Sequence, residues 1–487
     1  MKLLKDILYR AGIQEVHGDL NMAIESVHMD SRKVLAFSLF VAIKGSKVDG
    51  HEYMDLAIEK GATAIICEEL PSVIKKGITY VRVLDSAAAL GHIASNFYDD
   101  PSSKLNLIGI TGTNGKTTSA TLLFDLFKSL GYKCGLISTV VNRIGREEIA
   151  ATHTTPDPIA LQKLFSQMVE KKITHCFMEV SSHAIHQRRI EGARFDVAVF
   201  TNITHDHLDY HGTFDNYIKA KKLFFDRLSS DAHALYNLDD PHGDIMVQNC
   251  DAHLHTYAIR SMAEFRARII ENQFNGLHLM LDGNDLYSKL VGGFNAYNIL
   301  TAYATAVLLG EDKLSILTAI SGLDPVAGRF QYLLGPKNIT AIVDYAHTPD
   351  ALKNVLRTIQ EIRTGNEKVI TVVGCGGDRD KAKRPVMARV SCEFSDKVIL
   401  TSDNPRGEDP NQILADMQMG VEGQHYKKTL SIVDRREAIR TACSLAESGD
   451  ILLIAGKGHE KYQEIAGKKL PFDDYEIVGE TLKTLEN

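Results

Sequence analysis

The sequence has no long apolar run and none of the marks of a secreted protein. No stretch approaches the roughly 20 apolar residues that a membrane-spanning helix needs, and charged residues interrupt the apolar positions of the first ten, unlike a signal peptide. The seven cysteines are odd in number, lie far apart and form no CxxC pair, which argues against a zinc or redox site. We therefore expect a reduced, cytoplasmic protein that does not bind membranes.

The chain also lacks an excess of positive charge. Its 55 Lys and Arg residues are outnumbered by 62 Asp and Glu residues, so the net charge is −7 and nucleic acid is not an expected partner. Apolar residues make up 44% of the 487 residues, which excludes long disordered tracts and collagen-like structure. At roughly 150 residues per domain, this length predicts two to four domains.

Changes in sequence texture divide the chain into three parts. Residues 1–100 contain β-like apolar runs between amphipathic stretches and end in a polar, proline-containing segment typical of a linker. In residues 101–330, strands alternate with helical lengths, as a largely parallel sheet requires. In residues 331–487, an apolar strand followed by a polar or glycine-rich loop recurs four times. We predict three α/β domains with these bounds.

A glycine-rich segment, Gly112-Thr-Asn-Gly-Lys-Thr117, follows an apolar strand and precedes a helical stretch. In that context backbone N–H groups can point at phosphates. Lys116 would reach the β- and γ-phosphates, and the Thr117 hydroxyl would bind Mg²⁺. The strict GxxxxGK[ST] spacing fails, because Ile110 stands where its first glycine belongs. The segment predicts ATP or GTP binding but does not name a reaction.

Three downstream features are ambiguous when taken alone. Glu179 ends an apolar strand, where it could bind Mg²⁺ or be a solvated strand terminus. The segment 201–212 gathers three histidines and two aspartates, and it could be a site or a polar surface loop. Lys221 belongs to a lysine cluster on a predicted helix, and such clusters are usually solvated.

A dozen motifs, taken together and in order, resemble one family, the ATP-dependent Mur ligases of peptidoglycan synthesis. The matching segments run over essentially the whole chain: Asp30-Ser-Arg32, Thr111–Thr118, Thr154-Thr-Pro156, Glu179-Val-Ser-Ser-His183, Asn202–Gly212, Tyr217–Lys221, Asn295–Asn298, Gly328-Arg329, Asp344–Asp350, Gly374–Asp380, Asp403-Asn-Pro-Arg406 and Gly456–Glu460.

The resemblance implies a specific fold and activity. It implies a smaller N-terminal α/β domain that holds a uridine nucleotide, a central P-loop ATPase domain with a parallel sheet, and a C-terminal Rossmann-like domain that brings the incoming amino acid. It is greatest to the members that add the third residue of the stem peptide. Those enzymes use ATP and Mg²⁺ to join meso-2,6-diaminopimelate to the D-Glu side-chain carboxylate of UDP-N-acetylmuramoyl-L-Ala-D-Glu through an acyl phosphate.

The resemblance also assigns the nucleotide and metal positions. The ATP-binding positions are Gly112, Thr113, Asn114, Gly115, Lys116, Thr117, Thr118, Asn298, Arg329, Asp344 and His347. The catalytic positions are Lys116, Glu179, His207 and Lys221, and the metal positions are Thr117, Glu179, His207 and Lys221. In the family, the lysine at position 221 is carried as a CO₂-derived carbamate. A bare ammonium would repel Mg²⁺, whereas a carbamate supplies an anionic oxygen ligand.

Two further sets of positions belong to the other substrates. The UDP-muramoyl dipeptide positions are Ser31, Thr154, Thr155, Ser181, Gln187 and Arg189. The diaminopimelate positions are Arg379, Asp403, Asn404, Pro405, Arg406, Gly456 and Glu460. Diaminopimelate differs from lysine by one carboxylate, and the planar fork of Arg406 suits that group. Ser46–Val48, in the region that varies in its uridine contacts, and His153 receive no assignment.

Other functions stay open at this point. An L-lysine-adding relative would depart from the Asp-Asn-Pro-Arg sequence. A folylpolyglutamate synthase would not need the hundred residues before Leu105. A nucleotide-binding protein without ligase activity would need no amino-acid pocket. We expect a monomer.

Overall fold

The computed structural model describes residues 1–45 and 48–484, which form two compact units. The first unit comprises Met1–Gly112, Leu123–Thr201 and Asp215–Thr256, and the second comprises Thr113–Leu122, Asn202–Phe214 and Tyr257–Asn487. Over the described residues, no helix is both long and apolar enough to cross a membrane.

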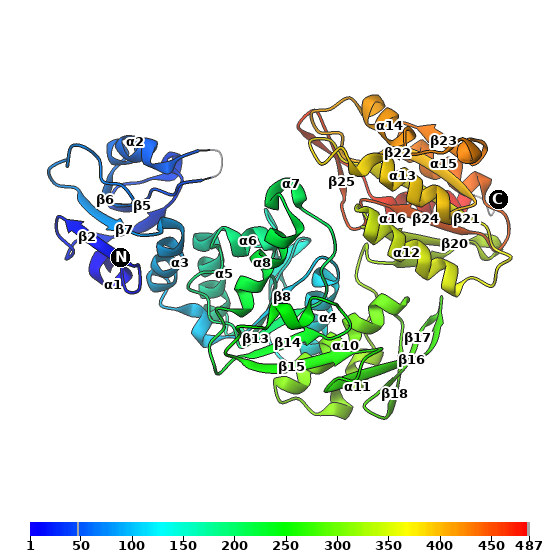
Figure 1. Ribbon diagram of the computed structural model, residues 1–487, viewed down its shortest axis with the longest axis horizontal. Coiled ribbons are helices and arrows are strands. Elements are labelled where there is room, and N and C mark those ends of the chain that lie inside the picture. Colours follow the sequence, from blue (N-terminus) through cyan, green and yellow to red (C-terminus); the bar gives the residue numbers. More distant parts are fainter. Residues whose placement is uncertain (46–47, 485–487) are drawn as a thin grey trace. The chain divides into compact units, whose positions relative to one another are not determined.

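The N-terminal part of the first unit is a five-stranded sheet with helices on both faces (Figure 1). Alternating residues of its strands point to opposite faces. Leu39 and Val41 pack with the helices α1 and α3, whereas Phe40 packs with α2. The strand order is β2 (Ile13–His17), β7 (Thr79–Val83), β6 (Ala62–Cys67), β5 (Ser38–Val41), β4 (Ser26–His28), and the helices are α1 (Leu4–Ile7), α2 (Met54–Glu59) and α3 (Ser86–Phe97). β1 (Lys2–Leu3) pairs with β3 (Ala23–Ile24).

The rest of the first unit is built on a mainly parallel sheet. Neighbouring strands run in the order β11 (Glu147–Ala150), β10 (Val141–Ile144), β9 (Cys134–Ile137), β12 (His175–Glu179), β8 (Asn106–Thr111), β13 (Val197–Phe200) and β14 (His233–Asn237). The strands β9, β12, β8, β13 and β14 are parallel to one another. β10 and β11 form an antiparallel edge beside β9. The connecting helices include α5 (Pro158–Glu170), α6 (Ser182–His186), α8 (Phe214–Phe225) and α9 (Gly243–Met246). The helix α4 (Lys116–Ser129) begins in the second unit and ends in the first. Apolar runs at residues 107–110, 176–180 and 197–200 predict three strands of this sheet, and these strands are present as β8, β12 and β13.

The second unit begins with strands for which the sequence analysis made no prediction. β15 (His253–Ala258), whose first residues belong to the first unit, pairs in parallel with β16 (Phe265–Gln273). β16, β17 (Gly276–Leu281) and β18 (Asn284–Ser288) are antiparallel neighbours. The mostly buried helix α10 (Gly293–Leu308) packs against β16, and α11 (Lys313–Ser321) packs against β18. α7 (Leu208–His211) also belongs to this unit.

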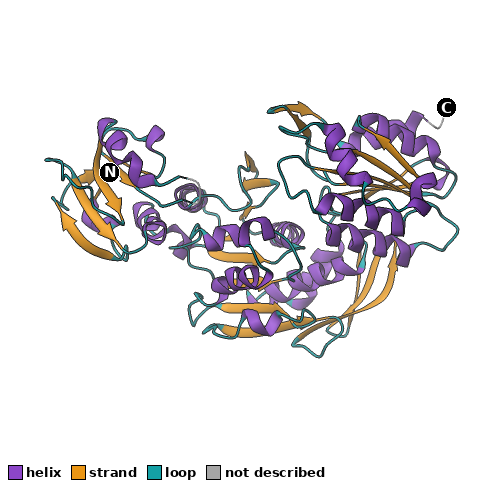
Figure 2. Ribbon diagram, turned by 45° about the horizontal axis from the view of Figure 1, so that its top comes forward, coloured by secondary structure: helices purple, strands orange, loops and turns teal. Residues whose placement is uncertain are grey.

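The C-terminal part of the second unit is a doubly wound α/β sheet, with helices on both faces (Figures 1 and 2). Its order is β19 (Gln331–Leu334), β20 (Thr340–Asp344), β24 (Ile451–Ala455), β21 (Val369–Cys375), β22 (Lys397–Ser402), β23 (Thr429–Ile432), and only β19 is antiparallel. One face carries α12 (Pro349–Ile362), α13 (Lys383–Phe394) and α14 (Pro410–Gln418), and the other carries α15 (Arg435–Leu445) and α16 (Asp474–Thr484). A hairpin of β25 (Tyr462–Ile465) and β26 (Lys468–Pro471) follows β24.

The carboxyl ends of these parallel strands carry the predicted amino-acid loops. The segments after β21, β22 and β24 contain Arg379, Arg406 and Glu460. Because parallel strands end at the same edge of a sheet, residues that are far apart in sequence meet there.

Candidate active site

The phosphate loop lies between the end of β8 at Thr111 and the start of α4 at Lys116. Gly112 and Gly115 have φ angles of +151° and +88°. Residues with a side chain rarely adopt such angles, so the local backbone explains both glycines. Lys116 Nζ donates to the carbonyl oxygen of Thr113 at 2.8 Å, which folds this side chain over the loop.

Asn202, after β13, shapes the same loop. Its side chain accepts from the backbone N–H of Asn114 at 2.9 Å and donates to the Asn114 carbonyl at 3.1 Å. Its own carbonyl accepts from the Thr113 N–H at 2.8 Å, and the Thr113 hydroxyl is bonded to the backbone of Thr204. The first part of the histidine-rich segment therefore contacts the phosphate loop.

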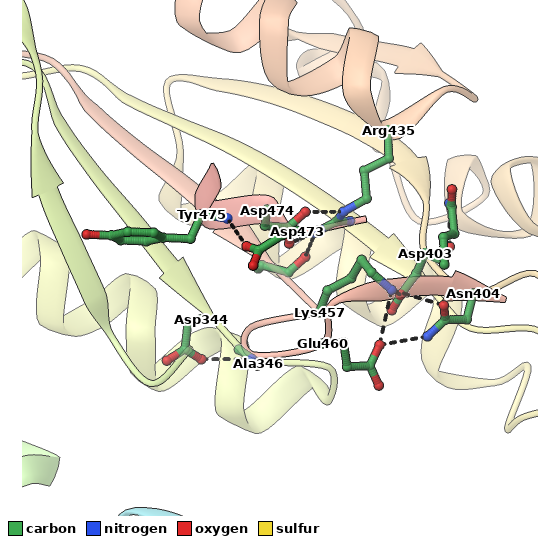
Figure 3. A network of polar contacts seen from close by, with 12 residues as sticks. Asp344, Ala346, Asp403, Asn404, Arg435, Lys457, Glu460, Asp473, Asp474 and Tyr475 are labelled. Atoms are coloured by element: carbon green, nitrogen blue, oxygen red, sulfur yellow. Dashed lines mark hydrogen bonds and ion pairs between the residues drawn. The ribbon is translucent and has the colours of Figure 1, made fainter. Parts of the chain in front are cut away.

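Arg329 and Thr117 are brought together across 212 residues of sequence. The Arg329 Nη2 donates to the Thr117 hydroxyl at 3.1 Å, and its guanidinium lies 4.6 Å from the centre of the Tyr345 ring. Asp344 accepts from the backbone N–H of Phe330 at 2.6 Å and from that of Ala346 at 2.7 Å; Figure 3 shows the second contact. Burial raises the pKa of Asp344, although Arg329 opposes the shift.

Asn298, a predicted ATP-binding residue, also has a structural role. It is 6% exposed, accepts from the Ser119 hydroxyl of α4 at 3.2 Å and donates to Asn295 at 2.9 Å. Its side chain thus ties α10 to the helix that follows the phosphate loop.

His207 and His347 are linked electrostatically through Asp206, which the motif comparison did not assign. His207 has a φ of +53° and its Nε2 lies 3.4 Å from Asp206 Oδ2. Burial would raise the pKa of Asp206, but His207, His347 and Lys116 together lower it. Burial and Lys383 lower the pKa of His347, which favours its neutral imidazole. An acidic residue among histidines is a weak sequence signal, because solvated loops have the same composition.

In the first unit, Glu179 is not a solvated strand terminus. It is fully buried, and its carboxylate accepts from the Thr139 N–H at 2.8 Å and from the Thr139 hydroxyl at 3.2 Å. A buried carboxylate at the end of a strand has the oxygen chemistry that Mg²⁺ prefers.

Lys221 is likewise not a surface lysine. It is 1% exposed, and its Nζ donates to the Gly112 carbonyl at 2.9 Å, lies 3.5 Å from the Thr111 hydroxyl and is 4.9 Å from the centre of the Tyr217 ring. The helix α8 thus delivers this side chain to the start of the phosphate loop.

The predicted donor set fits Mg²⁺ better than a metal that needs a complete protein cage. Among the described residues, no three His, Cys, Asp or Glu side chains converge as ligands. Mg²⁺ commonly keeps several waters and binds one or two carboxylates together with phosphate oxygens. Glu179 and the Thr117 hydroxyl are suitable oxygen donors of this kind.

Most predicted dipeptide positions form one cluster at the end of β12. The Thr155 hydroxyl donates to the Glu179 carbonyl at 2.8 Å and accepts from the Ser181 N–H at 3.1 Å. Ser181 caps α6 by accepting from the Ala184 N–H. Arg189 donates to the Thr155 carbonyl at 2.9 Å and, through two nitrogens, to Gln187 at 3.0 and 2.7 Å.

Thr154 and Ser31 are the two remaining predicted dipeptide positions. The Thr154 hydroxyl is 3.1 Å from the Thr139 hydroxyl, which joins it to Glu179. Ser31 is 7% exposed and lies in the N-terminal part of the unit, in a 3₁₀ turn whose preceding residue, Asp30, caps it. His153 is exposed, and Ser46 and Lys47 of the unassigned stretch lie outside the described residues.

The predicted amino-acid positions converge around a lysine that received no assignment. Lys457 is fully buried, and its Nζ lies 2.9 Å from Asn404 Oδ1, 3.1 Å from Glu460 Oε2 and 3.5 Å from Asp403 Oδ1 (Figure 3). Asn404 also donates to Glu460 Oε2 at 2.8 Å. Burial would raise the pKa of Asp403, but Lys457, Arg435, His347 and Arg406 lower it. The Gly-Lys-Gly-His-Glu sequence was the available signal for Lys457.

Of the other predicted amino-acid positions, some are held by neighbouring groups and others are exposed. Arg406 Nη1 donates to the Gly377 carbonyl at 2.8 Å, and Arg379 is exposed. Pro405 is buried beside Arg406. Gly456 has a φ of +119°, and a Cβ there would lie 3.3 Å from Asp403 Oδ2, so a side chain would crowd the Asp403 carboxylate.

Comparison with known proteins identifies the family. A protein of Cytophaga hutchinsonii is 56% identical over 99% of each chain, and one of Bacteroides thetaiotaomicron is 53% identical over 98% of this chain and 99% of its own. Both are named UDP-N-acetylmuramoyl-L-alanyl-D-glutamate–2,6-diaminopimelate ligase. The chain belongs to the Mur ligase family. Three models of that family match it: the catalytic domain at residues 23–98, the middle domain at 110–306 and the glutamate ligase domain at 328–458.

Solved structures agree with this assignment to the Mur ligases. A structure of a UDP-N-acetylmuramoyl-L-alanyl-D-glutamate–2,6-diaminopimelate ligase has a TM-score of 0.71 at 31% identity, covering 100% of this chain and 99% of its own. A folylpolyglutamate synthase from Thermotoga maritima shares the fold, with a TM-score of 0.60 at 16% identity over 76% of this chain and 90% of its own. The family resemblance and the three-part α/β fold are therefore confirmed.

Proposed function

We propose that this Mur ligase uses ATP to join meso-2,6-diaminopimelate to the D-Glu side-chain carboxylate of UDP-N-acetylmuramoyl-L-Ala-D-Glu, in the synthesis of peptidoglycan precursors. The observation that carries the proposal is identity above 50%, over almost the whole chain, to ligases named for these compounds. The Asp403-Asn-Pro-Arg406 loop supports the same choice of amino acid.

In this proposal the phosphate loop and its neighbours hold the nucleotide. Backbone N–H groups of Gly112–Thr118 and the Lys116 ammonium would bind the phosphates, and Arg329 would add a second cation. Asn298, Asp344 and His347 complete the ATP-binding set. The contact from Arg329 to Thr117 supports this placement, because it brings two predicted nucleotide positions together within one unit.

The chemistry requires two anions to be held in line for phosphoryl transfer. The D-Glu carboxylate would take the γ-phosphoryl group to give an acyl phosphate, and the incoming amine would then displace phosphate. Mg²⁺ would neutralise charge on the phosphate oxygens, with Thr117, Glu179, His207 and a carbamate on Lys221 as its proposed ligands. The burial of Glu179 and Lys221 supports a role other than solvation for both side chains.

The first-unit cluster would receive the dipeptide end of the nucleotide-linked substrate. Arg189 can pair with a substrate carboxylate, and the hydroxyls of Thr154, Thr155 and Ser181 can bond its amides. Gln187 holds the Arg189 guanidinium through two hydrogen bonds, which supports a preset orientation. Ser31 would contact the substrate from the N-terminal part of the chain.

Selection of diaminopimelate over lysine would depend on Arg406. A ligand without the distal carboxylate would leave the guanidinium, whose Nε lies 3.6 Å from Glu464 Oε2, without the hydrogen bonds to the substrate anion, at a cost of roughly 1–3 kcal/mol. Asp403, Asn404, Pro405 and Gly456 shape the pocket, Arg379 adds positive charge, and Glu460 would accept from the distal ammonium. Asp403 and Glu460 around Lys457 leave an excess of one negative charge, which matches that ammonium.

We also propose domains at residues 1–100, 101–330 and 331–487, and a cytoplasmic monomer. The polar segment before β8 and the start of a separate sheet at β19 support the two boundaries. Limited proteolysis tests the boundaries, and light scattering on the purified protein tests the monomer.

The activity is tested by phosphate release from ATP and Mg²⁺ with UDP-N-acetylmuramoyl-L-Ala-D-Glu. We expect release with meso-diaminopimelate and little with L-lysine or with no amino acid. A preference for lysine would overturn the role given to Arg406 but keep the ligase. Release with none of the three would overturn the proposal and direct the assay to folate acceptors.

A further inference from the structure

Two loops at the carboxyl edge of the C-terminal sheet interlock by direct hydrogen bonds. One follows β21 and contains Gly377 and Asp378, and the other follows β22 and contains Asn404 and Gly407. The Gly377 N–H donates to the Asn404 carbonyl at 2.9 Å, and the Gly407 N–H donates to Asp378 Oδ2 at 3.1 Å. A Cβ on Gly377 would lie 2.0 Å from the Pro405 carbonyl, so the approach requires glycine.

Glu408 links this pair of loops to the helix α13. Its Oε1 accepts from the Asp378 N–H at 2.6 Å and from Arg384 Nη2 at 2.9 Å, while its Oε2 accepts from Arg384 Nη1 at 3.0 Å. Arg384, on α13, is fully buried. Hydrogen bonds from Arg384 lower the pKa of Glu408 to about 2, so this ion pair is fully formed at neutral pH.

Arg406 is held in the middle of this arrangement in an unusual conformation. Its φ is +51°, a left-handed value that costs a non-glycine residue energy unless the surroundings enforce it. Its backbone is bonded on both sides to the β25 hairpin, from its N–H to the Glu464 carbonyl at 3.0 Å and from the Ala466 N–H to its carbonyl at 2.8 Å. Its side chain donates to the Gly377 carbonyl at 2.8 Å. Its Nε also lies 3.6 Å from Glu464 Oε2 in the same hairpin. The position of the guanidinium therefore depends on the β25 hairpin and on the loop that Glu408 holds.

We propose that Glu408, held by Arg384, is a positioning residue that presets Arg406 to receive the distal carboxylate of the amino-acid substrate. The proposal deepens the proposed function and rests on it. Glu408 needs no contact with the substrate for this role, because it acts through Asp378, Gly377 and Arg406. A carboxylate is required, since only an anion can accept from both Arg384 nitrogens and from a backbone N–H at once.

Asp416 offers a matched control for this test. It accepts from the same Arg384 Nη1 at 2.8 Å and is as exposed as Glu408, with 16% of each side chain accessible. It lies on α14, outside the two interlocked loops. Glu408→Gln and Asp416→Asn each remove one ion pair from Arg384, but only the first acts on the loop that holds Arg406.

The experiment measures kcat and KM for meso-diaminopimelate, L-lysine and ATP, together with urea unfolding, for the wild type and both variants. We expect Glu408→Gln to raise KM for diaminopimelate by about 10- to 100-fold, to leave KM for ATP unchanged and to narrow the preference over lysine. Asp416→Asn should also lower stability, though by less because Glu408 pairs with Lys381 at 3.4 Å as well, and should leave all three KM values unchanged.

Equal KM values for diaminopimelate in the two variants would overturn the positioning role, while an inactive wild type would instead overturn the proposed function. If Glu408→Gln does not fold, Asp378→Asn at an exposed site removes charge from the acceptor of the Gly407 N–H. It should raise KM for diaminopimelate several-fold, and an unchanged value would overturn the proposal.

Discussion

Lys457 and Lys221 are both buried lysines, at 0% and 1% exposure, but different chemical groups surround them. Lys457 lies within 3.5 Å of the carboxylates of Asp403 and Glu460. Lys221 is tied to the backbone of the phosphate loop, through the Gly112 carbonyl, and lies over the ring of Tyr217.

The comparison teaches that burial alone does not indicate what a lysine does. Burying an ammonium is unfavourable unless nearby groups compensate it. Lys457 is compensated by Asp403 and Glu460, which lie in the loops after β22 and β24, and it cross-links them. Lys221 is held against the backbone that would receive phosphate, so its chemistry bears directly on the charges brought there. The following predictions separate the two roles, from the largest expected effect to the smallest.

The largest effect should come from Lys221. We expect Lys221→Ala to reduce ligase activity by more than about 100-fold, and Lys221→Glu to retain more activity, because a carboxylate supplies part of what a carbamate would. Phosphate release measures both. Equal loss in the two variants, or full activity of the alanine variant, would remove the carbamate argument and make Lys221 resemble Lys457.

Lys457→Met should act mainly on stability. Removing the ammonium leaves the buried Asp403 and the partly buried Glu460 without their shared cation, and breaking a buried ion pair in this way costs about 3–5 kcal/mol. Urea unfolding of the variant measures the loss. The exposed Lys468→Met is the control and should change stability by less than about 0.5 kcal/mol. A loss for Lys457→Met no larger than that of the control would contradict the cross-linking role.

His459, two residues from Lys457, should make the stability of the protein depend on pH. Burial, Arg329, His347 and Lys457 lower the pKa of His459 to about 3 from 6.5. Between these values the unfolded chain binds a proton that the folded chain does not. Stability should therefore fall as pH drops through this window, by up to about 1.4 kcal/mol per pH unit from this group.

Unfolding curves across that pH window test the effect. His459→Gln should show a flatter dependence than the wild type. Lys457→Met should raise the pKa of His459 in the folded protein and so narrow the pH range over which stability falls. Identical pH dependence in the wild type and His459→Gln would show that the histidine does not contribute.

The smallest effect should come from Ser181, an uncharged member of the cluster at the end of β12. Ser181→Ala removes the cap of α6 and should lower stability by about 1 kcal/mol, with little dependence on salt because no ion pair is lost. Urea unfolding at low and high salt measures this. A loss that changes strongly with salt would mean that charge, as around Lys457, dominates this cluster too.

Local sequence signals were sufficient for the elements that depend on nearby residues. The phosphate loop was recognised from its glycines between an apolar strand and a helix, and β8, β12 and β13 were recognised from apolar runs. The structure explains Gly112 and Gly115 by their positive φ angles. The antiparallel strands β16 to β18 received no prediction, because the alternating sequence of a strand at a sheet edge does not show which strand it pairs with. Arg384 was missed because its role depends on Glu408 and Asp416, which lie 24 and 32 residues away.

The sequence by itself determined the family, the three-part α/β organisation and the polar residues at the ends of the strands, because motif order and apolar periodicity are properties of the chain. Only the tertiary structure decided which of those residues are buried and what they contact. It buried Glu179, Lys221 and Lys457 and brought Arg406 against Gly377. The physical reason is that the energy of a charge depends on its neighbours in space, and parallel strands bring distant segments to one edge.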